Sequence, residues 1–82
     1  MLKIIFQIYR GAKMKKHAKL KGLRNQCDLS QKKVGEQLGI TAQAYNSKEN
    51  GKTQFTYSEC LVIRDMLAER LGIPLTIDEL FA

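Results

Sequence analysis

The chain has 82 residues, a net charge of +6 and 44% hydrophobic residues. A chain of this length builds one small domain with a thin core, and its apolar content is too high for a disordered protein. The charge excess indicates a polyanionic partner, either nucleic acid or an acidic membrane surface. With two cysteines and one histidine, the chain is one ligand short of a Cys/His zinc site, and we expect neither a metal nor a cofactor.

The composition also argues against membrane-spanning, disulfide-stabilised and enzymatic classes. The longest apolar stretch is far shorter than the ~20 residues that cross a bilayer, and the N-terminus lacks the pattern of a signal peptide. Cys27 and Cys60 have no CxxC spacing, so we interpret both as reduced thiols of a cytoplasmic protein. His17 lies among lysines with no nucleophile at a meaningful spacing, and we therefore do not expect an enzyme.

Positive charge is concentrated in the first part of the chain. Residues 1–24 contain basic residues and no acidic one, residues 25–58 are close to neutral, and residues 59–82 carry an acidic excess. The basic residues of the first part are Lys3, Arg10, Lys13, Lys15, Lys16, Lys19, Lys21 and Arg24. A lysine run is often only a solvated helix face, but this many cations without a counter-charge favour an electrostatic partner.

The first segment is predicted to be an extension, residues 1–13, that precedes a domain of residues 14–82. Apolar residues alternate along residues 2–9 with the period of a β-strand, and Gly11 ends the pattern. Because no later segment has a strand pattern, we expect this strand to pair with its own copy in a homodimer as an antiparallel ribbon. The alternative, in which Met14 is the functional start, stays open.

Five helices are predicted after this extension. Leu20, Leu23 and Cys27 have the spacing of one helix face, which predicts a helix from about Lys13 to Cys27. Ser30 is a good N-cap for a second helix that Gly39 ends. The N-caps and ends predicted for the other three helices are Thr41 to about Asn50, Thr56 or Ser58 to Gly72, and Thr76 to Phe81.

The segment from Ser30 to Lys52 carries the most informative pattern. Its two short helices are joined by Leu38-Gly39-Ile40, and two helices with a tight glycine-containing turn make up a helix-turn-helix. Any pair of antiparallel helices with a glycine turn shows the same pattern, so this signal alone is moderate.

Further segments, in order and spacing, make the pattern specific. They are Leu20-Lys-Gly-Leu23-Arg24, Leu29-Ser30-Gln31, Val34-Gly35, Leu38-Gly39-Ile40-Thr41, Glu49-Asn50-Gly51-Lys52, Leu71-Gly72-Ile73 and Ile77-Asp78-Glu79-Leu80-Phe81. Together they resemble the phage-repressor and Cro-like helix-turn-helix (XRE) family over residues ~15–82. The resemblance implies an all-α bundle of five helices whose members bind operator DNA as dimers. Gly35, Lys48 and Phe55 differ from the residues that this family prefers.

The resemblance also implies which residues meet DNA. The helix at about 41–50 would enter the major groove, with Ala42, Gln43, Asn46 and Ser47 facing base edges. Gln43 and Asn46 can each present a bidentate amide to adenine, and Ala42 can touch a thymine methyl group. The implied phosphate contacts are Gln31, Thr41, Lys48, Asn50, Gly51 and Lys52. We expect Tyr45 to pack inward and Glu49 to pair with a nearby arginine or lysine.

The predicted function is a sequence-specific DNA-binding transcriptional regulator of the cytoplasm. Because the sequence has no second domain for ligand sensing or self-cleavage, we expect a Cro-like repressor that binds double-stranded DNA as a homodimer. An antitoxin that represses its own operon and binds a toxin is one alternative, and a helix-turn-helix bundle used only for protein–protein contact is another. A membrane-surface role ranks last, because the apolar and basic residues at the N-terminus are not segregated on one helical face.

Overall fold

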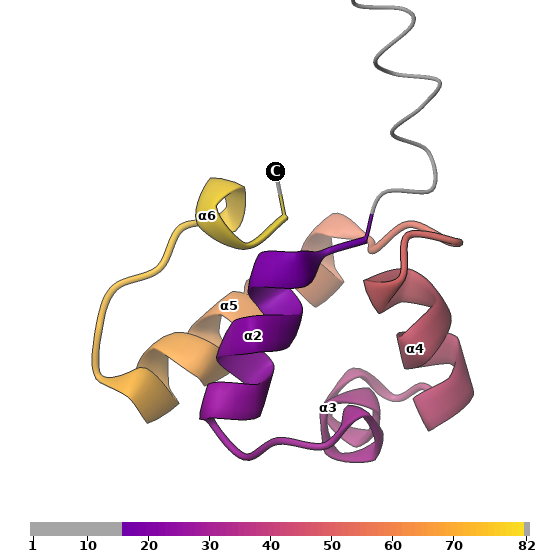
Figure 1. Ribbon diagram of the computed structural model, residues 1–82, viewed down its shortest axis with the longest axis horizontal. Coiled ribbons are helices and arrows are strands. Elements are labelled where there is room, and N and C mark those ends of the chain that lie inside the picture. Colours follow the sequence, from indigo (N-terminus) through magenta and orange to yellow (C-terminus); the bar gives the residue numbers. More distant parts are fainter. Residues whose placement is uncertain (1–15, 82) are drawn as a thin grey trace, which may run out of the picture.

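The computed structural model describes residues 16–81, and within this range the chain forms five helices and no strand. The helices are α2 (Ala18–Gln26), α3 (Gln31–Leu38), α4 (Ala42–Glu49), α5 (Tyr57–Leu71) and α6 (Ile77–Phe81), as Figure 1 shows. The predicted all-α bundle of five helices is confirmed. The strand predicted at residues 2–9, and the ribbon built from it, lie outside the described residues.

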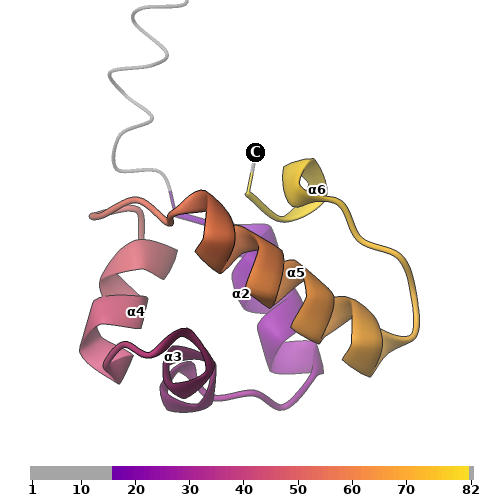
Figure 2. The ribbon, with the colours of Figure 1, turned by 180° about the vertical axis from the view of Figure 1, so that it is seen from behind.

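The helices pack around one shared core, to which α2 and α5 both contribute buried side chains. In both views (Figures 1 and 2) α3 and α4 lie side by side at one end of the bundle, and α6 lies at the other end. The last helix folds back so that it packs on both α2 and α5. The bundle therefore has one end built by the Ser30–Lys52 segment and another built by the long helix and the C-terminal turn.

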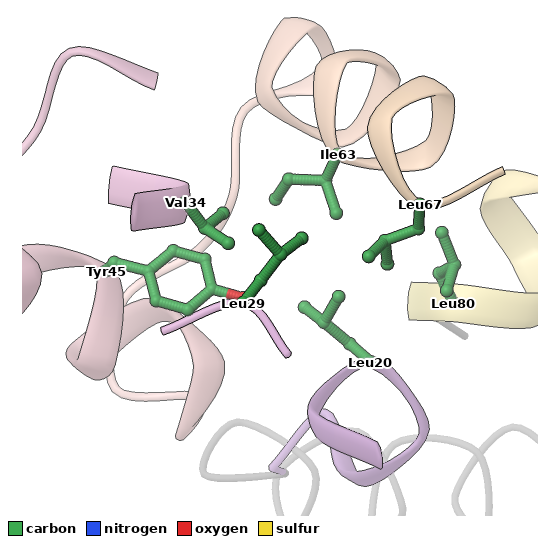
Figure 3. Packing of buried hydrophobic residues seen from close by; sticks show 7 residues of the cluster. All are labelled: Leu20, Leu29, Val34, Tyr45, Ile63, Leu67 and Leu80. Carbon is green, nitrogen blue, oxygen red and sulfur yellow. The ribbon is translucent and has the colours of Figure 1, made fainter. Parts of the chain in front are cut away.

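The apolar core lies where these helices meet. Figure 3 shows its buried side chains converging from every helix and from the α2–α3 link: Leu20, Leu29, Val34, Tyr45, Ile63, Leu67 and Leu80. The long helix α5 contributes one apolar face to this core, on which Cys60, Ile63 and Leu67 are buried. Full burial of an aliphatic or aromatic side chain stabilises the fold by about 1.5–3 kcal/mol, so these few residues dominate the packing energy.

Local hydrogen bonds define where the helices begin. The hydroxyl of Ser30 accepts from the Lys33 amide at 3.0 Å, and that of Thr41 accepts from the Ala44 amide at 3.0 Å. Thr56 forms a full capping box with Glu59. These caps satisfy amides that have no partner within the helix, and each is worth about 1 kcal/mol. The starts predicted at Ser30 and Thr41 are confirmed, and Thr56 rather than Ser58 opens α5.

The first helix is shorter than predicted. We expected it to begin at about Lys13, but α2 begins at Ala18, because His17 has non-helical backbone angles of φ −91° and ψ 73°. The backbone N–H of His17 donates instead to the carbonyl oxygen of Glu49 at 2.9 Å. This contact ties the start of α2 to the end of α4.

The turn between α3 and α4 depends on two glycines. Gly39 ends α3 at φ +75°, a left-handed conformation that favours glycine. A Cβ atom on Gly35 would lie 2.9 Å from the carbonyl oxygen of Ile40, so the turn backbone passes too close for any side chain there. A small residue at position 35 thus permits the close approach of this turn backbone to α3.

Candidate nucleic-acid interface

The α4 helix presents one buried and one exposed face. Tyr45 and Glu49 are buried, with 0% and 2% of their surface exposed, and they lie one turn apart on the same side of the helix. Gln43 and Asn46 are exposed, and Ala42 and Ser47 are half-buried. The inward packing predicted for Tyr45 is confirmed. The residues predicted to meet base edges thus include two exposed amides at the start and middle of α4.

A buried ion pair holds the end of α4 against α2. The Nε of Arg24 donates to Oε2 of Glu49 at 2.8 Å, and its Nη2 donates to Oε1 at 3.0 Å. The third contact of the guanidinium goes from Nη1 to the carbonyl oxygen of Leu29 at 2.7 Å. The hydroxyl of Tyr45 donates to Oε2 of Glu49 at 2.7 Å. Glu49 therefore has the basic partner that we predicted, and the partner is Arg24.

The ionisation of this cluster follows from its hydrogen bonds. Burial opposes the charge on Glu49, but hydrogen bonds from Arg24, Tyr45 and Gln31 outweigh it and keep the pKa of Glu49 below its usual value. The hydrogen bond to Glu49 raises the pKa of Arg24, and burial together with the same carboxylate raises the pKa of Tyr45. Arg24 and Glu49 thus carry opposite charges at neutral pH, while Tyr45 stays a neutral donor.

A chain of side-chain amides leads from this carboxylate to the exposed face of α3 and α4. Nε2 of Gln31 donates to Oε1 of Glu49 at 3.0 Å. Nδ2 of Asn46 then donates to Oε1 of Gln31 at 3.1 Å, and Nδ2 of Asn50 donates to Oδ1 of Asn46 at 3.1 Å. The first residue of α3, the middle of α4 and its C-cap are therefore joined by one continuous chain of hydrogen bonds.

The loop after α4 turns tightly before α5. Gly51 adopts φ +81°, a left-handed conformation that favours glycine, and its amide donates to the carbonyl oxygen of Lys48 at 3.1 Å. The amide of Lys52 donates to the carbonyl oxygen of Ser47 at 2.9 Å, and the Lys52 side chain is exposed. Of the phosphate contacts predicted in this loop, the Lys52 ammonium is the cation that reaches solvent.

The Lys48 side chain, unlike that of Lys52, is mostly buried and paired within the bundle. Its Nζ donates to Oε1 of Glu59 and to the carbonyl oxygen of Gln54, both at 3.0 Å, and lies 6.0 Å from the centre of the Phe55 ring. Only 16% of its side chain is exposed. Burial opposes the charge on Glu59, but hydrogen bonds from the Thr56 backbone and Lys48 lower its pKa. Lys48 thus ties the loop to the start of α5, and its predicted phosphate contact stays a prediction.

These features fit one family of proteins. A sequence model of the family described as "Helix-turn-helix" matches residues 20–77, which is most of the chain. The chain belongs to the helix-turn-helix family of phage repressors and Cro-like regulators. No curated protein and no solved structure matches the chain significantly. Like its family, this helix-turn-helix protein is a DNA-binding transcriptional regulator.

Membrane spans, metal ligands and cysteines complete the description of this helix-turn-helix protein. Within residues 16–81, no helix is both long enough and apolar enough to cross a bilayer, and no cluster of potential metal ligands is found. Both cysteines are free thiols, and burial raises the pKa of Cys60.

Sequence reasoning misplaced one residue of the helix-turn-helix. We counted Arg24 in the basic cluster, but it is 6% exposed and lies beneath the motif as the partner of Glu49. Its position four residues after Leu20 on the apolar face of α2 was the available signal, since a charge there is almost never buried without a partner. The bond between Asn46 and Asn50 fits their i, i+4 spacing, but the bond from Asn46 to Gln31 left no such signal, because these residues are 15 positions apart.

Proposed function

We propose that the chain is a repressor that binds operator DNA as a homodimer, with α4 in the major groove. The observation that carries this proposal is the fixed presentation of α4. Tyr45 and Glu49 hold its inner face, so the exposed residues at its N-terminal part keep a defined orientation. Base reading requires such an orientation, because a bidentate hydrogen bond discriminates among bases only when both of its atoms are placed together.

Gln43 is the proposed base reader of α4. It is exposed at the second position of the helix, and its side chain makes no hydrogen bond to other residues in the range 16–81. Its amide is therefore available to donate to adenine N7 and to accept from N6. Ala42 and Ser47 lie beside it and would contact a thymine methyl group and a neighbouring base edge.

Phosphate contacts would come from both sides of α4. We assign them to Gln31 at the start of α3, where the helix dipole favours an anion, to Thr41, and to the Asn50-Gly51-Lys52 loop. Other exposed cations can add to the attraction, since the described part of the chain carries Lys16, Lys19, Lys21, Lys32 and Lys33 on its surface. Arg24 and Lys48 are already paired and contribute little to this field.

Selection of bound sequences from a random DNA pool tests the proposal. We expect a motif with two half-sites related by a two-fold axis, because a symmetric dimer binds a palindromic operator. A motif with a single half-site would contradict the homodimer. Transcription in vitro from a promoter that overlaps the selected site should fall when the protein is added, whereas a rise would identify an activator.

The salt dependence of binding tests the phosphate contacts. If the dimer neutralises about five to eight phosphates, the log–log slope of affinity against salt should be roughly −4.5 to −7. A slope near zero would exclude this mode of binding. Lys52→Ala should weaken all DNA sequences alike and make the slope shallower, while Gln43→Ala should relax discrimination at one position of the selected site.

A further inference from the structure

The polarity of the amide chain is determined by Glu49. An ionised carboxylate only accepts hydrogen bonds, so the side of the Gln31 amide that faces it must be the NH₂ group. The observed donation from Nε2 of Gln31 to Oε1 of Glu49 agrees with this requirement. The Gln31 oxygen is consequently turned toward α4, where it can meet only a donor.

The orientation of the Gln31 amide in turn determines the orientation of the Asn46 and Asn50 amides on the exposed surface. Asn46 donates from Nδ2 to the Gln31 oxygen, which leaves Oδ1 of Asn46 to accept from Nδ2 of Asn50. All three amides therefore point their NH₂ groups toward the buried carboxylate. Hydrogen bonds aligned in this way polarise and strengthen one another. A buried charge thus sets which amide atoms face which way on the surface of the helix-turn-helix.

We propose that Asn46 is a positioning residue of the DNA-binding surface and reads no base itself. Adenine recognition by an asparagine uses both its amide oxygen and its amide nitrogen. Both atoms of Asn46 are already engaged, one with Gln31 and the other with Asn50. These two bonds hold the Asn46 amide turned toward Gln31 and Asn50, whereas the Gln43 side chain makes no such bond within the described chain and can turn toward a base.

The role of Asn46 is to hold Gln31 and Asn50 in place for phosphate binding. Each of the three NH₂ groups has a second N–H besides the one used in the chain. With Asn46 between them, Gln31 and Asn50 are held at a fixed separation on α3 and after α4. This inference rests on the proposed function, because it assigns these two amides to phosphate oxygens of bound DNA.

Affinity measurements on the selected operator and its single-base variants test this role. Asn46→Ala should weaken every duplex, non-cognate DNA included, by a similar factor of about three to ten, because it loosens phosphate contacts without removing a base contact. Gln43→Ala is the matched control on the same helix and should relax discrimination at one position. If Asn46→Ala also relaxes discrimination at one position, Asn46 is a base reader and the inference is overturned.

A double-mutant cycle separates positioning from independent contacts. Gln31→Ala combined with Asn46→Ala should weaken DNA binding less than the product of the two single effects, because both substitutions break the same chain. Effects that multiply would show that the two residues act independently, and would contradict the inference.

Side-chain amide signals in the NMR spectrum of the full chain without DNA provide a separate readout. Asn46→Ala should shift the side-chain NH₂ signals of Gln31 and Asn50, whereas Gln43→Ala should leave them in place. Unchanged signals in Asn46→Ala would overturn the inference whatever the affinities are. If the wild-type chain retains no DNA at all, the proposed function fails, whereas these signals still report whether the amide chain exists.

Discussion

The two ends of this bundle are held together by different forces. At the end built from α3 and α4, the buried residues of α4 are Tyr45 and Glu49, and both take part in hydrogen bonds within the Arg24 cluster. At the other end, α5 and α6 bury Ile63, Leu67 and Leu80 against Leu20, and these contacts are apolar. The helix that we propose to face DNA is therefore held by directional bonds in addition to the packing of Tyr45, and the other end of the bundle by apolar packing.

This difference matters because hydrogen bonds and ion pairs depend on direction, whereas apolar burial depends mainly on area. A core of aliphatic side chains tolerates small rotations of a helix. A guanidinium that donates two hydrogen bonds to one carboxylate resists such a rotation, because both hydrogen bonds lengthen when the helix turns. The polar end is thus suited to fix the orientation of α4, and the apolar end to supply stability.

The substitution Glu49→Leu tests the polar end, and we expect it to cause the largest loss in the free energy of unfolding. The guanidinium of Arg24 would remain buried without a counter-charge, which costs about 3–5 kcal/mol in the free energy of unfolding. Urea denaturation monitored by circular dichroism measures this loss.

The control removes the whole polar cluster. The triple variant Arg24→Met, Tyr45→Phe, Glu49→Leu leaves no buried charge behind, and it should recover most of the lost stability. Its DNA affinity should be lower than that of the wild-type chain, because Gln31 no longer has the Glu49 carboxylate that orients it. If the triple variant is no more stable than Glu49→Leu, an uncompensated charge is not the cause of the loss.

At the apolar end, Leu67→Ala should lower the free energy of unfolding by about 2–5 kcal/mol, because it opens a cavity in the core. The DNA affinity of the folded protein should change little, since Leu67 takes no part in the hydrogen bonds that join Arg24, Tyr45 and Glu49. Val62→Ala is the control on the same helix; its side chain is exposed, and the expected change is within about 0.5 kcal/mol. A large loss of DNA affinity in folded Leu67→Ala would show that the two ends are coupled.

A substitution in α3 beside the turn to α4, Gly35→Ala, should have an intermediate effect on the free energy of unfolding. The new methyl group in Gly35→Ala meets the backbone carbonyl oxygens of Ile40 and Thr41 at 2.9 and 3.1 Å, so the turn has to shift. We expect a loss of about 1–3 kcal/mol in stability together with weaker DNA binding. In contrast, Gly22→Ala places its methyl group in open space on α2 and should stabilise the protein by about 0.5–1 kcal/mol. Equal effects at the two glycines would contradict this explanation.

Lowering the pH should reduce the free energy of unfolding gradually. The pKa of Glu49 is lower in the folded protein than in the unfolded chain, where it is about 4.3. Its contribution to stability is therefore complete above that value and is lost as the pH falls through the folded pKa. Glu59 contributes in the same direction. Denaturation at decreasing pH should show a smaller acid loss in the triple variant, which retains Glu59, than in the wild-type chain.

Much of the fold could be predicted because its signals are local. Ser30 and Thr41 directly precede α3 and α4, and Gly39 and Gly72 directly follow α3 and α5, so helix starts and ends can be read within a few positions. The inward position of Tyr45 follows from the same spacing. The start of α2 was missed because it depends on a hydrogen bond from His17 to Glu49, which the local pattern does not contain.

The candidate site was predicted less completely. The residue types on α4 and in the loop after it could be named, but Arg24, Lys48 and Asn46 could not be assigned their partners. Arg24 and Glu49 are 25 positions apart, and Lys48 and Glu59 are 11 apart. The net charge includes Arg24 and Lys48, although the structure pairs them with Glu49 and Glu59. The net charge therefore does not show which cations are exposed to a partner.

Apart from the start of α2, the sequence by itself determined the helices, their caps and the identity of the helix-turn-helix, because each depends on hydrogen bonds and apolar spacing within a few residues. Only the tertiary structure decided which polar groups meet: the pairing of Arg24 with Glu49, the close approach of Gly35 to Ile40, and the amide chain through Gln31, Asn46 and Asn50. The physical reason is that hydrogen bonds act over about 3 Å and need a definite angle. Their partners are therefore settled only when packing has brought distant parts of the chain together.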